Sequence, residues 1–212
     1  MARLPAAPQL TGRDSTEAWE GALETSGLPL VVPAGRSRGR AVFGAPLPLG
    51  TAAERELVEI TLTELLPAWH VRERLAGGLP EGWQLVDLHD VWLGAPSLAS
   101  QVVAADYRID LGDADPMALA GAAQTLLAAG ALPRDRSKGG AIVRYDLRPL
   151  LVDVTVADPG PPVLLRARTR LDPALGSGRP EEVVAALGER VGTPLTVRSV
   201  ARERLILATD LG

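Results

Sequence analysis

The sequence predicts an α+β protein made of two consecutive ferredoxin-like domains, covering residues 1–94 and 95–212. Strand and helix patterns follow one another twice, in an order close to strand–helix–strand–strand–helix–strand, which is the ferredoxin-like order. A Gly/Pro/Ser-rich joint, LGAPSLAS, lies at residues 93–100, and the pattern restarts after it. A length of 212 residues suits one large domain or two small ones. With 46% hydrophobic but only 3% aromatic residues, the core is expected to be aliphatic.

Two helices are expected in the first domain. The first begins near Asp14, where Glu17 follows at the spacing of a capping box, and Gly27 ends it. The second begins at Pro67 and ends before Gly77, because proline is favoured at the start of a helix and glycine just after its end.

The strands of the first domain are expected from alternating apolar and polar residues. ERELVEITLTELL at 54–66 and GWQLVDLHDVWL at 82–93 both alternate in this way. Two short extended pieces are expected within 29–50, around a Gly/Arg loop. The first strand is expected to be degenerate or missing, because ARLPAAPQL contains two prolines.

The second domain contains the clearest helix of the sequence, DADPMALAGAAQTLLAAG. Asp115 is the expected N-cap, Pro116 lies in the first turn, and Gly130 ends the helix. A second helix is expected at RPEEVVAALG, with two acidic residues at its positive end. Five strands complete this domain and include one extra strand: QVVAADYRIDL, AIVRYDL, PLLVDVTV, VLLRARTRL and PLTVRSVARERLIL.

Composition excludes several classes of site. The chain has no cysteine and two histidines, so thiolate zinc sites, cysteine-ligated clusters and disulfides are excluded and a site of several histidines is not expected. We expect no cofactor. A net charge of −4 argues against generic nucleic-acid binding without a local basic face. No apolar run suits a signal peptide or a membrane span, so we expect a cytoplasmic protein with no membrane contact.

One stretch, RDRSKGGAIVRYDLRPLL at 134–151, is basic within this acidic chain. Arg134, Arg136 and Lys138 are expected in a loop, and Arg144 in the strand that follows. An anion or nucleic-acid site and a solvated hairpin are both open interpretations. The motif Asp146, Leu147, Arg148 and Pro149 is interpreted as a turn into the next strand.

The strand VLLRARTRL carries a row of arginines. Because side chains alternate along a strand, Arg166, Arg168 and Arg170 share one face, which Arg144 could join. Such a row can bind phosphates. Neighbouring strands, however, place acids that would neutralise it, and this interpretation is favoured: Asp106, Asp110 and Asp153.

Two further patterns have simple interpretations. The loop AGRSRGRA could form backbone nests for anions, but it lacks both common phosphate-loop patterns, so a hairpin tip is favoured. Asp87 and His89 share a strand face and could act as a general base pair. A surface pair is the favoured interpretation, because no nucleophile motif accompanies them.

Several phrases together resemble one known family. They are GLPL, FGAPLPLG, EITL, LPEGWQLVD, APSLASQVVAADYRI, DLRPLLVDV and RPEEVVAAL, in this order along nearly the whole chain. The sequence resembles the radical SAM-linked family, a bacterial domain of unknown function found fused to, or encoded beside, a radical SAM protein with a cobalamin-binding-type domain. The resemblance implies that a radical SAM protein is the partner.

Three functions follow as hypotheses. The leading one is a non-catalytic accessory module of a radical SAM enzyme, working in RNA modification. The alternative is an RNA- or anion-binding module that uses the basic loop and sheet face. The third is a small hydrolase or transferase that uses carboxylates, which would need two acids converging in one pocket.

Overall fold

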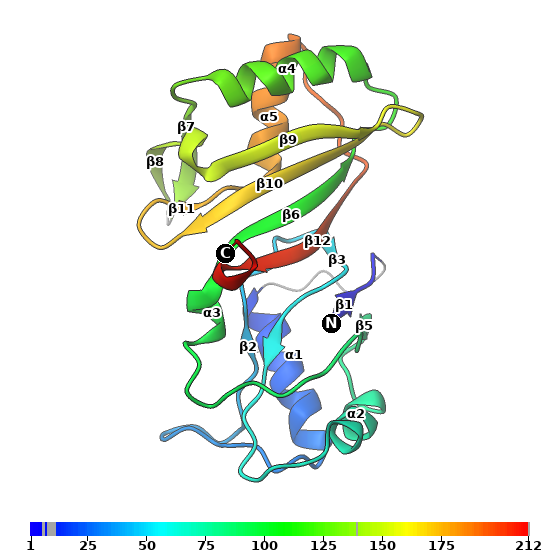
Figure 1. Cartoon of the computed structure of the whole chain (residues 1–212), viewed down its shortest axis with the longest axis vertical. Coiled ribbons are helices and arrows are strands. Elements are labelled where there is room, and N and C mark those ends of the chain that lie inside the picture. Colours follow the sequence, from blue (N-terminus) through cyan, green and yellow to red (C-terminus); the bar gives the residue numbers. More distant parts are fainter. Residues whose placement is uncertain (6, 8–11, 139, 212) are drawn as a thin grey trace. The chain divides into compact units, whose positions relative to one another are not determined.

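The computed structural model describes residues 1–5, 7, 12–138 and 140–211, and the chain folds as two compact units (Figure 1). Unit 1 comprises Met1–Val102 and Leu207–Gly212, and unit 2 comprises Val103–Ile206. The described residues form a mixed α/β structure with five α-helices and mainly antiparallel strands. At this level the expected α+β class is confirmed. No helix in the described part of the chain is both long and apolar enough to cross a membrane.

Unit 1 is built from short strands around three helices. Its elements are β1 (Ala2–Arg3), α1 (Gly12–Thr25), β2 (Val42–Phe43), β3 (Thr51–Ala53), β4 (Val58–Glu59), α2 (Ala68–Ala76), β5 (Trp83–Gln84), α3 (Leu98–Gln101) and a final 3-10 turn (Ala208–Leu211). Strand β1 pairs antiparallel with both β3 and β5. Strands β2 and β4 form a separate antiparallel pair.

Aromatic rings lie at the centre of the unit 1 core. Trp19 of α1 packs edge-to-face on Phe43 and Trp83, with ring centroids 5.9 Å and 5.3 Å apart. Leu23 of α1 and Val71 of α2 are buried in the same cluster. The core of this unit is therefore partly aromatic, whereas composition predicted an aliphatic one.

Unit 2 has long strands and two long helices. Its elements are β6 (Val102–Asp110), α4 (Pro116–Ala128), β7 (Pro133–Lys138), β8 (Ala141–Asp146), a 3-10 turn (Arg148–Leu150), β9 (Leu151–Asp158), β10 (Leu164–Asp172), β11 (Gly176–Ser177), α5 (Pro180–Val191) and β12 (Ser199–Leu207). The sheet order is β9-β10-β6-β12, with β10 antiparallel to both β9 and β6. Helices α4 and α5 contact each other and pack on the sheet.

The sequence signals of unit 2 act as expected. Asp115 caps α4 by accepting hydrogen bonds from the backbone N–H groups of Met117 and Ala118. Alternation along β10 buries Leu165, Ala167 and Thr169 against the helices. The core of this unit is mainly aliphatic, although Tyr107 is also buried in it. Its fully buried side chains include Ile109, Leu119, Leu126, Leu165 and Leu187.

Two sequence-based expectations are wrong. Residues 134–138 were expected in a loop, but they belong to β7, which pairs antiparallel with β8. The long strands expected at 54–66 and 82–93 contain only β4 and β5 as regular strands. These two strands are short because the strands that pair with them are short or interrupted. Strand β1, which pairs with β5, has only two residues, and Pro33 interrupts the chain between Leu30 and β2, which pair with residues 58–62.

Candidate functional site

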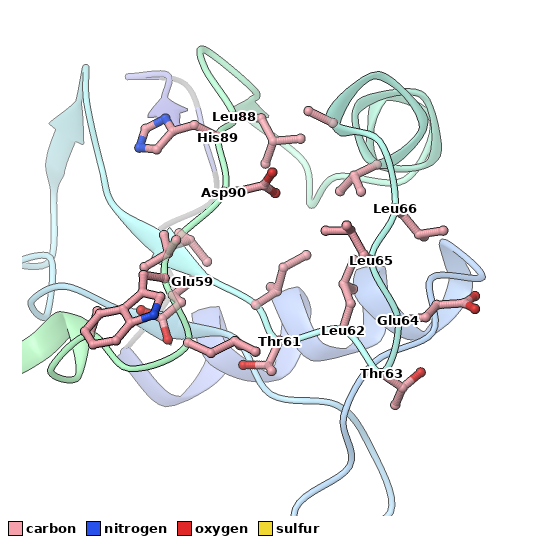
Figure 2. Close-up of a pocket in the computed structure, with 18 residues that line it drawn as sticks. Glu59, Thr61, Leu62, Thr63, Glu64, Leu65, Leu66, Leu88, His89 and Asp90 are labelled. Atoms are coloured by element: carbon pink, nitrogen blue, oxygen red, sulfur yellow. The ribbon is translucent and has the colours of Figure 1, made fainter.

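An apolar groove in unit 1 is the best-formed candidate site. It lies between two extended stretches, residues 58–66 and 88–95, and Ala68 and Val71 of α2 line it as well (Figure 2). Its cavity volume is about 510 Å³. We call this feature the unit 1 groove.

The floor of the unit 1 groove is continuous with the core. Val58, Ile60 and Leu62 alternate along the first stretch and pack against the buried cluster, as does Leu88 from the second stretch. Glu59, Thr61 and Thr63 are the intervening residues. The alternation expected from the sequence is therefore present, although most of the stretch is not regular sheet.

Large apolar side chains at the groove are exposed to solvent. Leu65 is 89% exposed, Trp92 78% and Leu93 91%. Val91 beside them is about half exposed. Exposed large apolar side chains around a groove are typical of binding sites in soluble proteins, since leaving such side chains in water brings no benefit to folding.

The charged groups of the groove share one sign. Among the 18 described residues that line it, the carboxylates are Glu59, Glu64 and Asp90, and neither lysine nor arginine is present. Figure 2 shows Asp90 extending from its stretch toward the stretch that carries Leu65. The groove is therefore apolar inside with acidic residues around it, and it favours a basic occupant over an anionic one.

The backbone of residues 57–63 is paired along one edge. Thr61 accepts a hydrogen bond from the N–H of Val31 (2.8 Å), and the N–H of Thr63 donates to Pro29 (2.7 Å). The N–H of Gly44 likewise donates to Leu57 (3.0 Å). In an antiparallel ladder, the N–H and C=O of alternate residues point to opposite edges. The backbone N–H and C=O groups of the odd-numbered residues therefore point to the paired edge. The N–H and C=O groups of Val58, Ile60 and Leu62 point to the opposite edge.

The proposed general base pair lies at the surface. Nδ1 of His89 lies 4.0 Å from an Asp87 carboxylate oxygen, and both side chains are 76% exposed. Asp87 also approaches Arg72 at 3.8 Å. In the described part of the chain, no three histidine, cysteine, aspartate or glutamate side chains lie close enough together to hold a metal ion. The side chains of Asp87 and His89 both face solvent, as the surface-pair interpretation expects.

The arginine row expected from the sequence exists, and Arg166 and Arg168 of this row are paired with acids. Arg168 of β10 donates two hydrogen bonds to Asp106 of β6, at 2.7 Å and 3.0 Å, and Arg204 of β12 donates a third at 2.9 Å. Burial is the largest single influence and raises the pKa of the Asp106 carboxyl. The hydrogen bonds and charges of Arg168 and Arg204 together outweigh burial and hold that pKa below its usual value.

Glu203 of β12 is a second acid beside the row, and it was not predicted from the sequence. It pairs with Arg166 at 3.0 Å and Arg108 at 3.3 Å. Asp110 instead accepts a hydrogen bond from the N–H of Gly112, while Asp153 lies opposite Arg168 in the β9–β10 register. Arg170 is exposed. Only the strand order, which places β12 beside β6, could have identified Glu203 as a partner of these arginines.

The basic hairpin β7–β8 is tied to its own unit. Arg134 forms an ion pair with Glu189 of α5, and the guanidinium of Arg136 lies 4.8 Å from the ring centre of Tyr145. On the opposite face, Arg144 pairs with Asp135 at 3.1 Å. The side chain of Lys138 lies outside the described residues.

The half-buried carboxyl of Glu182 lies near these arginines. Burial raises the pKa of the Glu182 carboxyl above its usual value, and the charges of Arg136 and Arg134 offset this only in part. Among the described residues, the buried polar atoms that lack a hydrogen-bond partner include Oε2 of Glu182, Nε of Arg134 and the hydroxyl of Tyr145. The side chain of Tyr145 is half buried.

The DLRP motif stabilises the fold around α4. Asp146 accepts hydrogen bonds from the N–H groups of Leu132 (2.7 Å) and Arg148 (2.9 Å), and Leu147 is buried. Arg148 donates to carbonyls at the end of α4, those of Leu127 and Ala129, and to that of Leu151. These bonds satisfy carbonyls that a helix end leaves without intrahelical partners. Pro149 lies in the 3-10 turn that follows.

The Gly/Arg loop of unit 1 is also paired with acids. Arg36 donates to both carboxylate oxygens of Glu20, at 2.8 Å and 2.7 Å. Arg38 pairs with Glu24 at 2.8 Å. Both acids belong to α1, so the loop is held against this helix and two of its guanidiniums are already engaged.

Comparison with known proteins identifies a family. Residues 10–183 match the family model described as an uncharacterized protein conserved in bacteria (DUF2344). The match covers well over half of the chain. A search of the curated proteins finds no match.

Proposed function

The chain belongs to the DUF2344 family of uncharacterized bacterial proteins, and we propose that it is a non-catalytic accessory protein that binds a protein partner in the unit 1 groove. The observation that supports this most is the exposure of Leu65, Trp92 and Leu93 around a cavity of about 510 Å³. A few residues near the centre of an interface supply most of its binding energy, and tryptophan is among the residues enriched there.

The partner proposed is a radical SAM enzyme. The proposal rests on the resemblance of phrases along the whole chain to the radical SAM-linked family. It agrees with a division of labour, because the chain has no cysteine with which to hold an iron–sulfur cluster and the enzyme would supply it. RNA modification by that enzyme is part of the same proposal.

Binding of RNA or another anion by this chain itself is the alternative, and it has less support. The guanidiniums of Arg166 and Arg168 are engaged by acids, as is that of Arg134. Releasing them for phosphate would mean breaking these pairs. Under this alternative, binding of a structured RNA weakens steeply with salt and is lost in the double variant Arg166→Glu, Arg168→Glu.

We also propose that unit 2 has the ferredoxin-like arrangement. The order β9-β10-β6-β12 corresponds to 2-3-1-4 when the extra hairpin β7–β8 and β11 are set aside. Helix α4 connects β6 with β9, and α5 connects β10 with β12. Both features support the split βαβ topology of that fold. In unit 1, the separate β2–β4 pair gives less support.

Binding to the purified radical SAM protein encoded nearest in the same genome tests the proposed function. Titration calorimetry with the full chain is expected to detect a complex. Trp92→Ala is expected to weaken it about tenfold or more, because this exposed indole would be buried at the interface. Trp69→Ala is the matched control, since Trp69 is also exposed but does not line the groove. Absence of a complex, or equal losses in both variants, contradicts the proposal.

A further inference from the structure

We infer that the unit 1 groove binds an extended segment of a protein partner, apolar and basic in composition, which adds as a strand along the free edge of residues 58–62. This inference rests on the proposed function and names the occupant of the same site. It goes further by stating the conformation of that occupant and the chemistry of its side chains.

Among the described residues, one edge of the backbone of residues 58–62 is free. In the described part of the chain, the N–H and C=O groups of Val58, Ile60 and Leu62 on this edge have no hydrogen-bond partner. The opposite edge is held by Val31, Pro29 and Gly44. An exposed edge with one side fixed is a template for an added strand, and β-strand addition is a recurrent mode of peptide recognition.

The groove runs along this free edge. Residues 58–62 all line the cavity, and residues 88–93 line it from the second stretch. At a rise of about 3.3 Å per residue, the five residues span roughly 16 Å, which suits a strand of about six residues.

The side chains that line the groove are apolar and acidic. In an extended occupant, side chains alternate between two faces. One set would meet Ile60, Leu62 and Val71, which the core already supports, and could extend to Trp92. The groove also carries the carboxylates of Glu59, Glu64 and Asp90, so basic side chains in the other set would be favoured.

Amide exchange of the isotope-labelled full chain tests this inference. The probe is a synthetic peptide of about six residues that alternates lysine with valine. On saturation, exchange of the amides of Val58, Ile60 and Leu62 is expected to slow by about tenfold or more, because they gain acceptors. The amide of Thr63 already donates to Pro29, so it is expected to change little.

Two matched peptides separate backbone pairing from charge. A version with alternate backbone nitrogens methylated cannot donate to the edge, and a version with glutamate in place of lysine reverses the charge. Both are expected to bind at least about tenfold more weakly. The inference is overturned if the lysine peptide does not bind, if it binds without slowing these three amides, or if the glutamate peptide binds equally well.

The outcomes for the two proposals are distinguishable. If the radical SAM protein binds through Trp92 and these amides are not slowed by the peptide, strand addition is wrong and the proposed function stands. If that protein does not bind, the proposed function fails whatever the peptide does. Sedimentation can show whether the chain alone forms a dimer. If it does, and if exchange of the same amides is slower in the dimer, the occupant is a second copy, which contradicts a distinct partner.

Discussion

The two units differ in how they use their strands and their exposed surfaces. In unit 2, the strands β6, β10 and β12 have nine residues each and β9 has eight, and the arginines beside Asp106 and Glu203 are paired. In unit 1, no described strand exceeds three residues, and large apolar side chains remain exposed around the groove.

Under the proposed function, unit 2 is the scaffold and unit 1 carries the binding surface. The acids and arginines on the sheet of unit 2 largely satisfy one another. Unit 1 leaves a backbone edge and exposed side chains such as Leu65 and Trp92 that bring no benefit to folding alone. Departures from a fully satisfied fold are expected where a protein functions.

The largest effect on stability is expected from the unit 2 core. Leu165→Ala should lower the free energy of unfolding by about 2–5 kcal/mol, since Leu165 is fully buried and its loss leaves a cavity. Leu65→Ala in the groove should change it by less than about 0.5 kcal/mol, because this side chain is exposed. Denaturant unfolding measures both. Similar losses in the two variants would show that the groove is part of the structural core.

The next effect concerns the paired carboxylate of the sheet. Asp106→Asn is expected to cost about 1.5–3 kcal/mol, because it removes the charge that accepts hydrogen bonds from Arg168 and Arg204. Asp113→Asn is the control, since its pair with Arg198 is exposed and should be worth at most about 1 kcal/mol. If the two substitutions cost the same in urea unfolding, the sheet pairs are no stronger than ordinary surface pairs.

The same carboxylate should make stability depend on pH in the acid range. The pKa of Asp106 in the folded chain lies below its usual value, so its contribution is present above about pH 4, the unfolded pKa. That contribution is lost as the pH falls through the lower folded pKa. The difference in unfolding free energy between the wild type and Asp106→Asn should therefore shrink on acidification. A constant difference from neutral pH to about pH 2 contradicts this expectation.

The smallest effect on stability is expected at Glu182, and its pH dependence is opposite in sign to that of Asp106. Burial raises the pKa of this carboxyl, so folding favours the protonated form and stability falls as the pH rises through the folded pKa. Glu182→Gln should therefore raise the melting temperature at neutral pH slightly, and this gain should disappear on acidification. Glu181→Gln, at the neighbouring exposed position, serves as the control. A lower melting temperature for Glu182→Gln would contradict the expectation.

Local sequence signals predicted the elements that depend on neighbouring residues in the chain. Asp115 and Pro116 identified the start of α4, and alternation in VLLRARTRL separated the arginine face of β10 from its buried face. The strand β7 could not be recognised, because Arg134–Lys138 has no apolar alternation and pairs only through its neighbour β8.

The candidate site depended on tertiary arrangement and was not predicted. Alternation in 54–66 and 82–93 indicated two strands, but only β4 and β5 within them are regular strands, and the groove lies between the two stretches. The partner of Arg166 was equally hidden, since Glu203 is 37 residues away in the chain and comes close only through the strand order.

Photo-cross-linking tests the central claim most directly, namely that the unit 1 groove is the docking surface for the partner. A photoreactive amino acid is placed at Leu93 in one sample and at Ile142 of the β7–β8 hairpin in another, because both side chains are highly exposed. With the purified radical SAM protein, the account predicts a cross-linked product from position 93 and none from position 142. A product from position 142 alone, or from neither position, would contradict it.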